Sequence, residues 1–218
     1  LQSASANIIT KNLVLNQNLI GDFDFSLIGS PIYKTYKITT SVANGRKKNI
    51  QGFGNIFIVD KNINLDIDFD LDNFDISFLS SFGKNKVNKI NGLVTGKLNL
   101  WGSMSDIKFK GQTFIDKGNL YLPITNTEYR IKDRTPIYFQ DQSIKFVDAE
   151  LVDTYENTFA TANGNLIHKN FKEWGIDLDV TSQRLLVFNK TKNLESRFYG
   201  KGFLNGEASF KGPFKSLN

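Results

Sequence analysis

The sequence contains no cysteine, one histidine, one methionine and two tryptophans among its 218 residues. Without cysteine the chain cannot form disulfides, thiolate-ligated zinc sites or a thiol nucleophile. The absence says little about compartment, because bacterial envelope proteins also often lack cysteine. No stretch approaches the roughly 18 uninterrupted apolar residues of a membrane-spanning helix. We therefore expect no such helix in this part of the chain.

Residues that could carry catalysis are equally scarce. His168 follows Leu166 and Ile167 at the end of a predicted strand, and no serine lies in the Gly-x-Ser-x-Gly turn of a hydrolase. A pair of carboxylates acting as acid and base stays open in principle, but the sequence selects no pair among its 22 acidic residues. The prediction is therefore no enzyme, no catalytic residue and no cofactor.

The chain repeats itself with a long period. Gly92, Gly96 and Gly102 return as Gly202, Gly206 and Gly212 at a constant offset (202−92 = 206−96 = 212−102 = 110). Upstream, Gly54-Asn55-Ile56 returns as Gly164-Asn165-Leu166, and Asp66-Ile67-Asp68-Phe69 returns as Asp177-Leu178-Asp179-Val180 with one residue inserted. Such a period indicates an elongated array of stacked units, here one continuous body over residues 1–218 with about two repeats, 1–106 and 107–218. We also expect the chain to be a piece of a longer protein.

Each unit consists of strands with one apolar and one wet face. Between Ile63 and Leu71, apolar residues alternate with asparagine and aspartate, which is the period of a half-buried strand. The same alternation spans 22–27, 98–100 and 174–180. When Gly, Asn, Asp and Pro are taken to mark the turns between strands, the sequence predicts about fifteen short strands. Their ranges are 7–15, 22–29, 31–43, 49–59, 63–71, 92–101, 107–116, 118–122, 128–133, 136–140, 143–153, 157–168, 174–181, 184–189 and 198–211. Residues 74–82 fit a short helix or a further strand, and the 19 phenylalanines suit wide apolar sheet faces.

Two basic clusters and one acidic run invite other interpretations. The net charge is +5, and its basic clusters are Arg46-Lys47-Lys48 and the Lys84, Lys86, Lys89 group. Nucleic-acid binding favours a basic stripe with stacking aromatics, whereas the aromatics here belong to apolar strand faces, so no nucleic-acid partner is expected. Asp66, Asp68, Asp70 and Asp72 resemble the start of a calcium loop, but that loop needs Gly at position six and Glu at position twelve, where this chain has Leu71 and Ser77. The carboxylates fit the wet face of a strand, and no metal site is predicted.

Parts of the sequence resemble a known family. The stretches that carry the resemblance are Asn165 to Trp174, Phe188-Asn189-Lys190-Thr191, Phe198-Tyr199-Gly200-Lys201-Gly202-Phe203 and Ser209-Phe210-Lys211-Gly212-Pro213. They are similar to the C-terminal domain of the TamB family, the translocation and assembly module subunits. Residues 90–102 and 110–123 look like the preceding AsmA-type repeat. Gly102 lacks the proline often found after this glycine, whereas Gly212-Pro213 retains it.

The resemblance implies a specific architecture and role. The family's body is a curved sheet called a β-taco, whose concave side is a hydrophobic groove. Members are anchored in the inner membrane, cross the periplasm and partner an outer-membrane barrel of the BamA family. Their proposed work is to carry phospholipid between the membranes, with assistance to barrel-protein assembly as an older proposal. The expected ligands are therefore phospholipid acyl chains.

Alternation assigns residues to the two faces of this all-β, elongated, curved antiparallel sheet. The residues expected in the lipid groove are Phe23, Phe25, Leu27, Ile63, Leu65, Ile67, Phe69, Leu71, Leu98, Leu100, Ile176, Leu178 and Val180. Those expected to face water are Asp22, Asp24, Asp66, Asp68, Asp70, Asp177 and Asp179. Because periodicity cannot distinguish a face covered by lipid from one covered by protein, a second possibility stays open. It is a β-sandwich or right-handed β-helix that closes its own core and serves as an adhesin, a carbohydrate binder or a structural or folding-assisting module.

Overall fold

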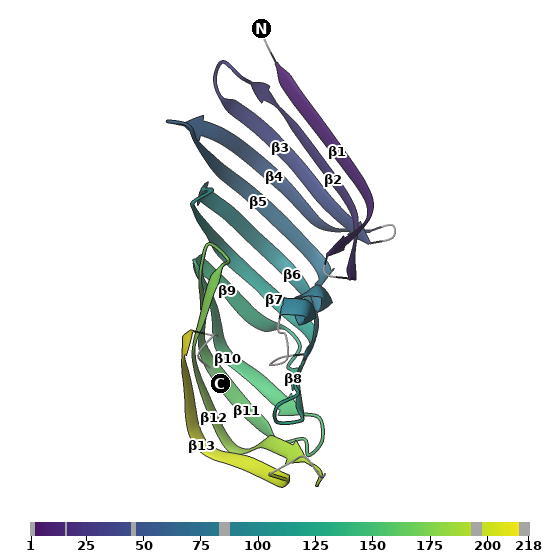
Figure 1. Cartoon of the computed structure of the whole chain (residues 1–218), viewed down its shortest axis with the longest axis vertical. Coiled ribbons are helices and arrows are strands. Elements are labelled where there is room, and N and C mark those ends of the chain that lie inside the picture. Colours follow the sequence, from purple (N-terminus) through teal and green to yellow (C-terminus); the bar gives the residue numbers. More distant parts are fainter. Residues whose placement is uncertain (1–2, 16, 45–46, 83–87, 193–197, 214–218) are drawn as a thin grey trace.

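All strands of the described chain belong to one antiparallel sheet. A computed structural model describes residues 3–15, 17–44, 47–82, 88–192 and 198–213, without side-chain detail at 81, 82 and 88. The sheet has 13 strands in the order β1-β2-β3-β4-β5-β6-β7-β8-β10-β11-β12-β13, and β9 pairs with both β7 and β10. The strands stack along the long axis of the molecule (Figure 1). The elongated all-β prediction is confirmed, and the described chain adopts neither two packed sheets nor a parallel β-helix.

The elements follow one another with short turns. Their bounds are β1 Ala4–Leu15, β2 Asn18–Ser30, β3 Thr35–Asn44, β4 Lys47–Val59, β5 Asn62–Asp75, η1 Ser77–Phe82, β6 Asn88–Ser103, β7 Asp106–Leu122, β8 Thr127–Ile131, β9 Thr135–Asp141, β10 Ser143–Asp153, β11 Phe159–Lys169, β12 Glu173–Lys190 and β13 Gly200–Pro213. The helix anticipated between 74 and 82 is the short 3-10 helix η1, and residues 74–75 still belong to β5.

The fifteen expected strands become thirteen because two pairs of them are single bent strands. β7 spans both 107–116 and 118–122, and β12 spans both 174–181 and 184–189. In β7 the break falls where Lys117 has a positive φ of 54° and the pairing shifts between Asn91 and Leu93 of β6. A β-bulge bends a strand without ending its ladder, so the turn-like residues there mark bends. Residues 31–34, expected in a strand, form a turn before β3.

The sequence repeat is also a repeat of strand register. Gly54 of β4 pairs with Ile67 of β5, which pairs with Leu100 of β6. The equivalent residues pair in the same way, Gly164 of β11 with Leu178 of β12 and Leu178 with Phe210 of β13. The bulge repeats as well, after Leu71 in β5 and after Ser182 in β12. These two residues are 111 apart because the second copy has one inserted residue upstream of them (182−71 = 111). The three strands β4–β6 therefore recur as β11–β13.

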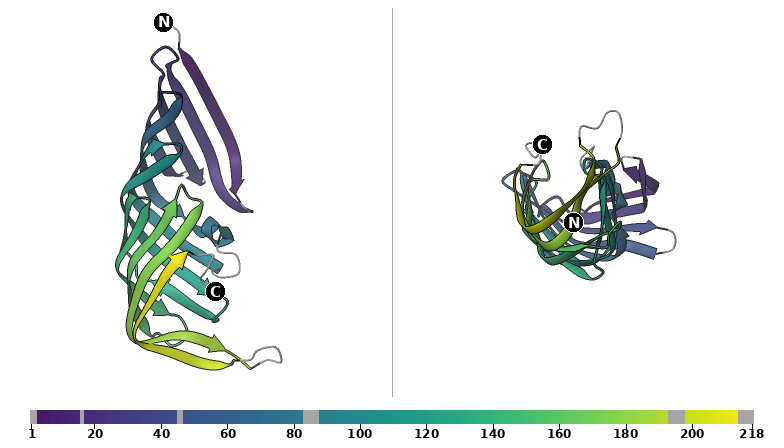
Figure 2. Two further views of the ribbon diagram at one scale, coloured as in Figure 1. Left: turned by 60° about the vertical axis from the view of Figure 1, so that its left-hand side comes forward. Right: turned by 90° about the horizontal axis from the view of Figure 1, so that it is seen from below.

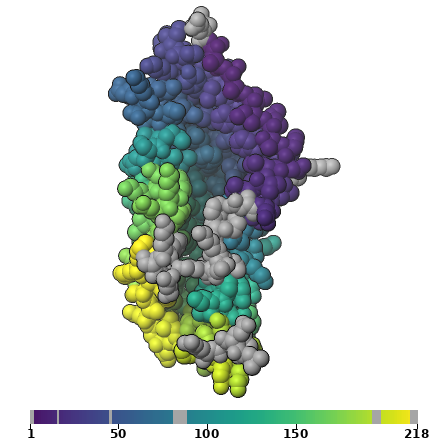
Figure 3. Space-filling view, in the orientation of Figure 1, coloured from purple at the N-terminus to yellow at the C-terminus, as the bar shows by residue number. Residues whose placement is uncertain are grey.

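The sheet is bent into a trough. Seen from below, its strands trace a U (right panel of Figure 2), and the space-filling view shows a hollow between the strip of β1–β2 and the facing ends of β4–β5 (Figure 3). The curvature increases toward the C-terminus, where β12 returns to β8 although three steps of the strand order separate them. Of the two basic clusters in the sequence, Arg46 of one and Lys84 and Lys86 of the other lie outside the described residues.

Candidate functional site: an apolar trough

Cross-sheet contacts identify the concave face. Tyr129 of β8 donates a hydrogen bond from its hydroxyl to the carbonyl of Leu186 in β12 at 2.8 Å, and β8 and β12 are not neighbours in the sheet. Side chains can meet in this way only on the inside of a bend. Val180 belongs to the same buried cluster as Tyr129, and it shares its face with Leu178 and Ile176, two residues apart along β12. The apolar face is therefore the concave face.

The register places one continuous row of apolar residues across this face. Directly paired residues of antiparallel strands point to the same side of a sheet, so the ladder can be followed from strand to strand. The row, here called the central row, consists of Ile8, Phe25, Thr40, Gly52, Phe69, Leu98, Gly111, Phe139, Ile144, Leu166, Ile176 and Gly212. These twelve positions include no charged residue. Most of them are partly exposed, so the row is apolar surface that the chain leaves accessible.

A second row runs parallel to the central row. The flanking row consists of Thr10, Phe23, Val42, Ile50, Leu71, Gly96, Thr113, Ile137, Phe146, Gly164, Leu178 and Phe210. No charged residue occupies these positions either. The Thr113 hydroxyl is fully buried and has no hydrogen-bond partner among the described residues. The two rows together form the floor of the trough.

The thirteen residues expected in the groove all lie on this concave face. Leu65 and Ile67 are buried at 7% and 8% exposure, and they pack with Ile38 in a small core on the concave face, beside the central row. Most of the others are partly buried, whereas Ile63 at the end of β5 is 45% exposed. The side chains shield one another because the bend brings neighbouring strands' inner faces together.

The convex face carries the charges. Asp24, Asp66, Asp68, Asp70 and Asp179 are exposed there, and Asp22 and Asp177 are partly exposed. The Asn99 amide donates hydrogen bonds to Asp66 and Asp68 at 2.7 and 3.0 Å. Asp70 pairs with Lys97 at 3.3 Å, and Asp177 with Lys211 at 3.0 Å, both across neighbouring strands. These carboxylates therefore stabilise the outer surface by cross-strand pairing.

An aromatic cluster borders the trough at the turn between β11 and β12. His168, 3% exposed, stacks on Phe171 with a ring-centroid distance of 4.4 Å and contacts Phe109 at 5.0 Å and Trp174 at 4.9 Å. Its Nδ1 accepts a hydrogen bond from the Phe171 N–H at 3.1 Å, so Nε2 carries the proton of the neutral ring. Burial lowers the pKa of His168 below its ordinary 6.5. The predicted strand-end histidine is thus a packed, neutral side chain.

A protein-filled core borders the trough on the opposite side, where β12 meets β8. Ala149, Ala160, Ala162 and Leu185 are buried in it together with Tyr129 and Val180. Beyond the Tyr129 hydrogen bond, the Asn189 N–H donates to the Thr125 carbonyl at 2.9 Å. The C-terminal part of the central row therefore runs between this core and the aromatic cluster.

A buried carboxylate fixes the loop at the rim of this core. Asp153 is fully buried and accepts hydrogen bonds from the hydroxyl of Thr158 and from the N–H groups of Tyr155, Glu156 and Thr158. Burial alone would raise the pKa of Asp153, but these hydrogen bonds outweigh it and hold the pKa below the ordinary 3.8. The Thr158 hydroxyl in turn accepts a hydrogen bond from the Leu186 N–H at 2.8 Å, which ties the loop to β12.

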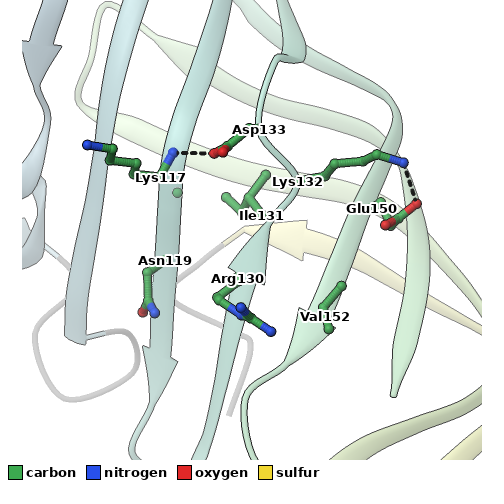
Figure 4. A pocket seen from close by; sticks show the side chains of 9 residues that line it. Lys117, Asn119, Arg130, Ile131, Lys132, Asp133, Glu150 and Val152 are labelled. Atoms are coloured by element: carbon green, nitrogen blue, oxygen red, sulfur yellow. Dashed lines mark hydrogen bonds and ion pairs between the residues drawn. The ribbon is translucent and has the colours of Figure 1, made fainter. Parts of the chain in front are cut away.

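A shallow hollow of about 500 Å³ opens between β7 and β10, where the two short strands β8 and β9 each pair with both of these longer strands (Figure 4). Several of its charged side chains already have partners: Lys132 pairs with Glu150 at 3.0 Å, the Arg130 guanidinium donates to the Asn157 amide oxygen at 3.3 Å, and Asp133 accepts a hydrogen bond from the backbone N–H of Lys117 at 2.6 Å. Within the described ranges, no group of three or more His, Cys, Asp or Glu side chains is placed to hold a metal ion. Among the same residues, no helix is long and apolar enough to cross a membrane.

Sequence reasoning missed the middle of the C-terminal half of the central row. Phe139, Ile144 and Leu166 belong to this row but were not expected among the groove residues. Alternation was hard to read there because a bulge between Phe146 and Ala149 shifts the inward positions of β10 by one residue. The signal that could have found them is the alternation of apolar and polar residues within 136–140 and again within 143–146.

No family model, curated protein or solved structure matches this chain.

Proposed function

We propose that this chain is a shielded apolar conduit that carries phospholipid acyl chains. The observation that supports the proposal is the central row, in which twelve uncharged and mostly partly exposed positions follow one another on the concave face from β1 to β13. Monomeric soluble proteins rarely leave a contiguous apolar surface of this extent uncovered without a ligand or partner for it. A lipid tail satisfies such a surface along its whole length.

The dimensions suit this ligand. Twelve strands make eleven steps of about 4.8 Å, so the central row extends over about 53 Å. An acyl chain spans half of the roughly 30 Å hydrocarbon core of a bilayer, or about 15 Å. Several tails therefore fit in succession, each buried methylene retaining about 0.8 kcal/mol relative to water. Since neighbouring positions differ little in chemistry, sliding along the row is nearly neutral while the head group stays in water at the open side.

The cellular setting proposed for this conduit follows from the resemblance to the TamB family. The chain acts in the periplasm as part of a longer protein anchored in the inner membrane, and it delivers phospholipid toward the outer membrane. A barrel protein of the BamA family receives the far end of the full-length protein. The proposed mechanism is passive. The trough supplies a path shielded from water, and movement of a lipid along this path requires no reacting group.

A structural or folding-assisting module for outer-membrane protein assembly is the second candidate. The C-terminal core favours it, because there the sheet closes on its own side chains, including the Tyr129 to Leu186 hydrogen bond. A module of this kind needs a rigid, self-covered body and no lipid. Its trough along β1–β6 would then be covered by segments of client proteins.

The lipid content of the purified chain distinguishes the two candidate functions. Lipid is extracted from the folded chain and identified by mass spectrometry, with Leu166→Arg as a variant that places a charge in the central row and Gln112→Arg as a variant that adds the same charge at an exposed position of the convex face. The conduit predicts bound phospholipid in the wild type and in Gln112→Arg, and its loss in Leu166→Arg. A folded wild-type chain free of lipid after expression in cells and after incubation with phospholipid vesicles would favour the structural module.

A further inference from the structure

His168 presents a buried hydrogen-bond donor to the trough. Its side chain is 3% exposed, and its Nδ1 accepts a hydrogen bond from the Phe171 N–H, so the proton of the neutral ring is on Nε2. Nε2 is buried and has no hydrogen-bond partner among the described residues. Buried donors of folded proteins are nearly always paired, so an unpaired one points to an acceptor that a ligand supplies.

The pairing of β11 with β12 places this donor on the concave face. Leu166 of the central row pairs with Ile176, and His168 pairs with Trp174 two positions further along. Residues two apart in a strand point to the same side of the sheet, so the imidazole projects from the concave face. Nδ1 adjoins the ring carbon that is bonded to Cβ, whereas Nε2 is at the far end of the ring. The unpaired donor is therefore at the tip of a side chain that points into the trough.

His168 lies at the boundary between the apolar floor and water. It is two residues, or about 6.7 Å, beyond Leu166 toward the rim, and the turn at 170–172 begins two residues later. Phe109 connects it to the central row, because the Phe109 ring contacts His168 at 5.0 Å and Phe139 of that row at 5.2 Å. An apolar tail that lies on the central row and leaves the trough over this turn therefore passes His168.

We infer that His168 anchors a phospholipid in the trough by donating a hydrogen bond from Nε2 to an acyl ester carbonyl oxygen. The inference rests on the proposed conduit and names the group by which the chain holds its ligand at this place. In a phospholipid the ester carbonyls join the apolar tails to the head group, which is the order of the central row, His168 and the turn. The ester oxygen is also a neutral acceptor, and it enters an aromatic surrounding at less cost than an anion.

Phe171 is the ring of the aromatic cluster that yields to the ligand. Phe109 is 6% exposed, and Trp174 is partly buried and donates a hydrogen bond from its indole N–H to the Phe171 carbonyl at 3.1 Å. The Phe171 side chain is 47% exposed, so turning it away from the imidazole uncovers less apolar surface than moving either of the other rings. The Phe109 ring, tilted by 51° to the imidazole, is a weaker acceptor than a carbonyl oxygen and does not compete with the ester.

The single histidine of the sequence allows a direct test. Histidine is labelled with ¹⁵N, so NMR of the whole chain observes the His168 ring alone. The chain is loaded from vesicles of phosphatidylcholine with ester-linked tails or from vesicles of the diether analogue, which has the same tails and head group but no carbonyls. Mass spectrometry of the extracted lipid establishes equal loading. The Nε2–H proton signal should move downfield with the diester lipid and change by less than about a third as much with the diether lipid, which offers Nε2 no carbonyl.

The outcomes separate this inference from the conduit. Equal changes with the two lipids, or no change while both are bound, would overturn the anchoring role of His168 and leave the conduit intact. Absence of bound lipid in both samples would overturn the conduit itself and the anchor with it.

A variant provides a second measurement. His168→Phe keeps an aromatic ring in the cluster and removes the donor, and thermal unfolding establishes that it is folded. Loaded below one lipid per chain from vesicles with equal amounts of the two lipids, the wild type should take up the diester lipid in at least about twofold preference, as one neutral hydrogen bond supplies. His168→Phe should show no preference. A preference of the same size in His168→Phe would assign the carbonyl to another group and overturn the inference.

Discussion

Replacing Leu98 by arginine puts a guanidinium in the middle of the central row. Leu98 lies between Phe69 and Gly111 in the ladder, is partly exposed, and belongs to neither of the two buried clusters. The fold therefore loses little packing, whereas a lipid tail passing along the row meets a charge. Gln112→Arg is the matched control, because Gln112 is exposed on the convex face of the adjoining strand.

The size of the effect depends on how much of the tail stays in water beside the arginine. A tail that cannot bury three methylenes there is destabilised by about 2.4 kcal/mol, at about 0.8 kcal/mol per methylene. Since about 1.4 kcal/mol in a barrier is a factor of ten in rate, passage slows about fiftyfold. Complete desolvation of the guanidinium would add several kcal/mol and slow it further. The surface charge in Gln112→Arg meets no tail and leaves the rate unchanged.

The assay is transfer of a fluorescent phospholipid from donor to acceptor vesicles by the purified chain. Circular dichroism and thermal unfolding of both variants establish that each is folded. The expected result is transfer by wild type and Gln112→Arg, with a rate at least tenfold lower for Leu98→Arg. If the folded inward and outward variants transfer lipid at the same rate, tails do not travel along the central row.

Three further predictions concern stability. Gly164→Ala should lower the free energy of unfolding in urea by about 1–3 kcal/mol, because its Cβ would lie 2.1 Å from the carbonyl oxygen of Asp177; an effect no larger than that of Gly175→Ala, whose nearest contact is 3.4 Å, would contradict the close approach. Since the pKa of His168 is lowered in the folded state, the unfolded chain binds more protons below pH 6.5, so stability falls as pH drops below that value; thermal unfolding of His168→Phe should lack this component, and identical pH profiles would be inconsistent with a buried neutral ring. Because the pKa of Asp153 is lowered in the folded state, its contribution to the free energy of unfolding is fully present above the unfolded pKa near 3.8 and is lost as the pH falls through the folded pKa. Asp153→Asn should therefore be less stable at pH 7, and its stability should fall less steeply than that of the wild type as the pH is lowered; a steeper fall would refute this account.

Much of the fold could be predicted from local pattern. The alternation from Ile63 to Leu71 assigned inner and outer residues because a strand has a period of two and a slip of one residue would expose every apolar side chain. The glycine offset predicted equivalent strands, and the register of Gly54 with Ile67 and of Gly164 with Leu178 shows that the equivalence includes pairing partners. The local sequence was sufficient there because one face of each strand is apolar and the other is charged or polar.

Features that depend on distant residues could not be predicted. The closure of β12 on β8 depends on the Tyr129 hydroxyl reaching the carbonyl of Leu186, a contact of residues 57 apart that no local pattern signals. The bend of β7 depends on a positive φ at Lys117, a residue type that gives no such indication.

Photo-crosslinking with a phospholipid that carries a reactive group within its acyl chain tests the central claim most directly. The folded chain is loaded from vesicles, irradiated and digested, and the crosslinked residues are identified by mass spectrometry. The account predicts adducts at Phe69, Leu98, Ile144 and Leu166 of the central row, which unlabelled phospholipid displaces. Adducts spread over the convex face, or none that unlabelled phospholipid displaces, would contradict it.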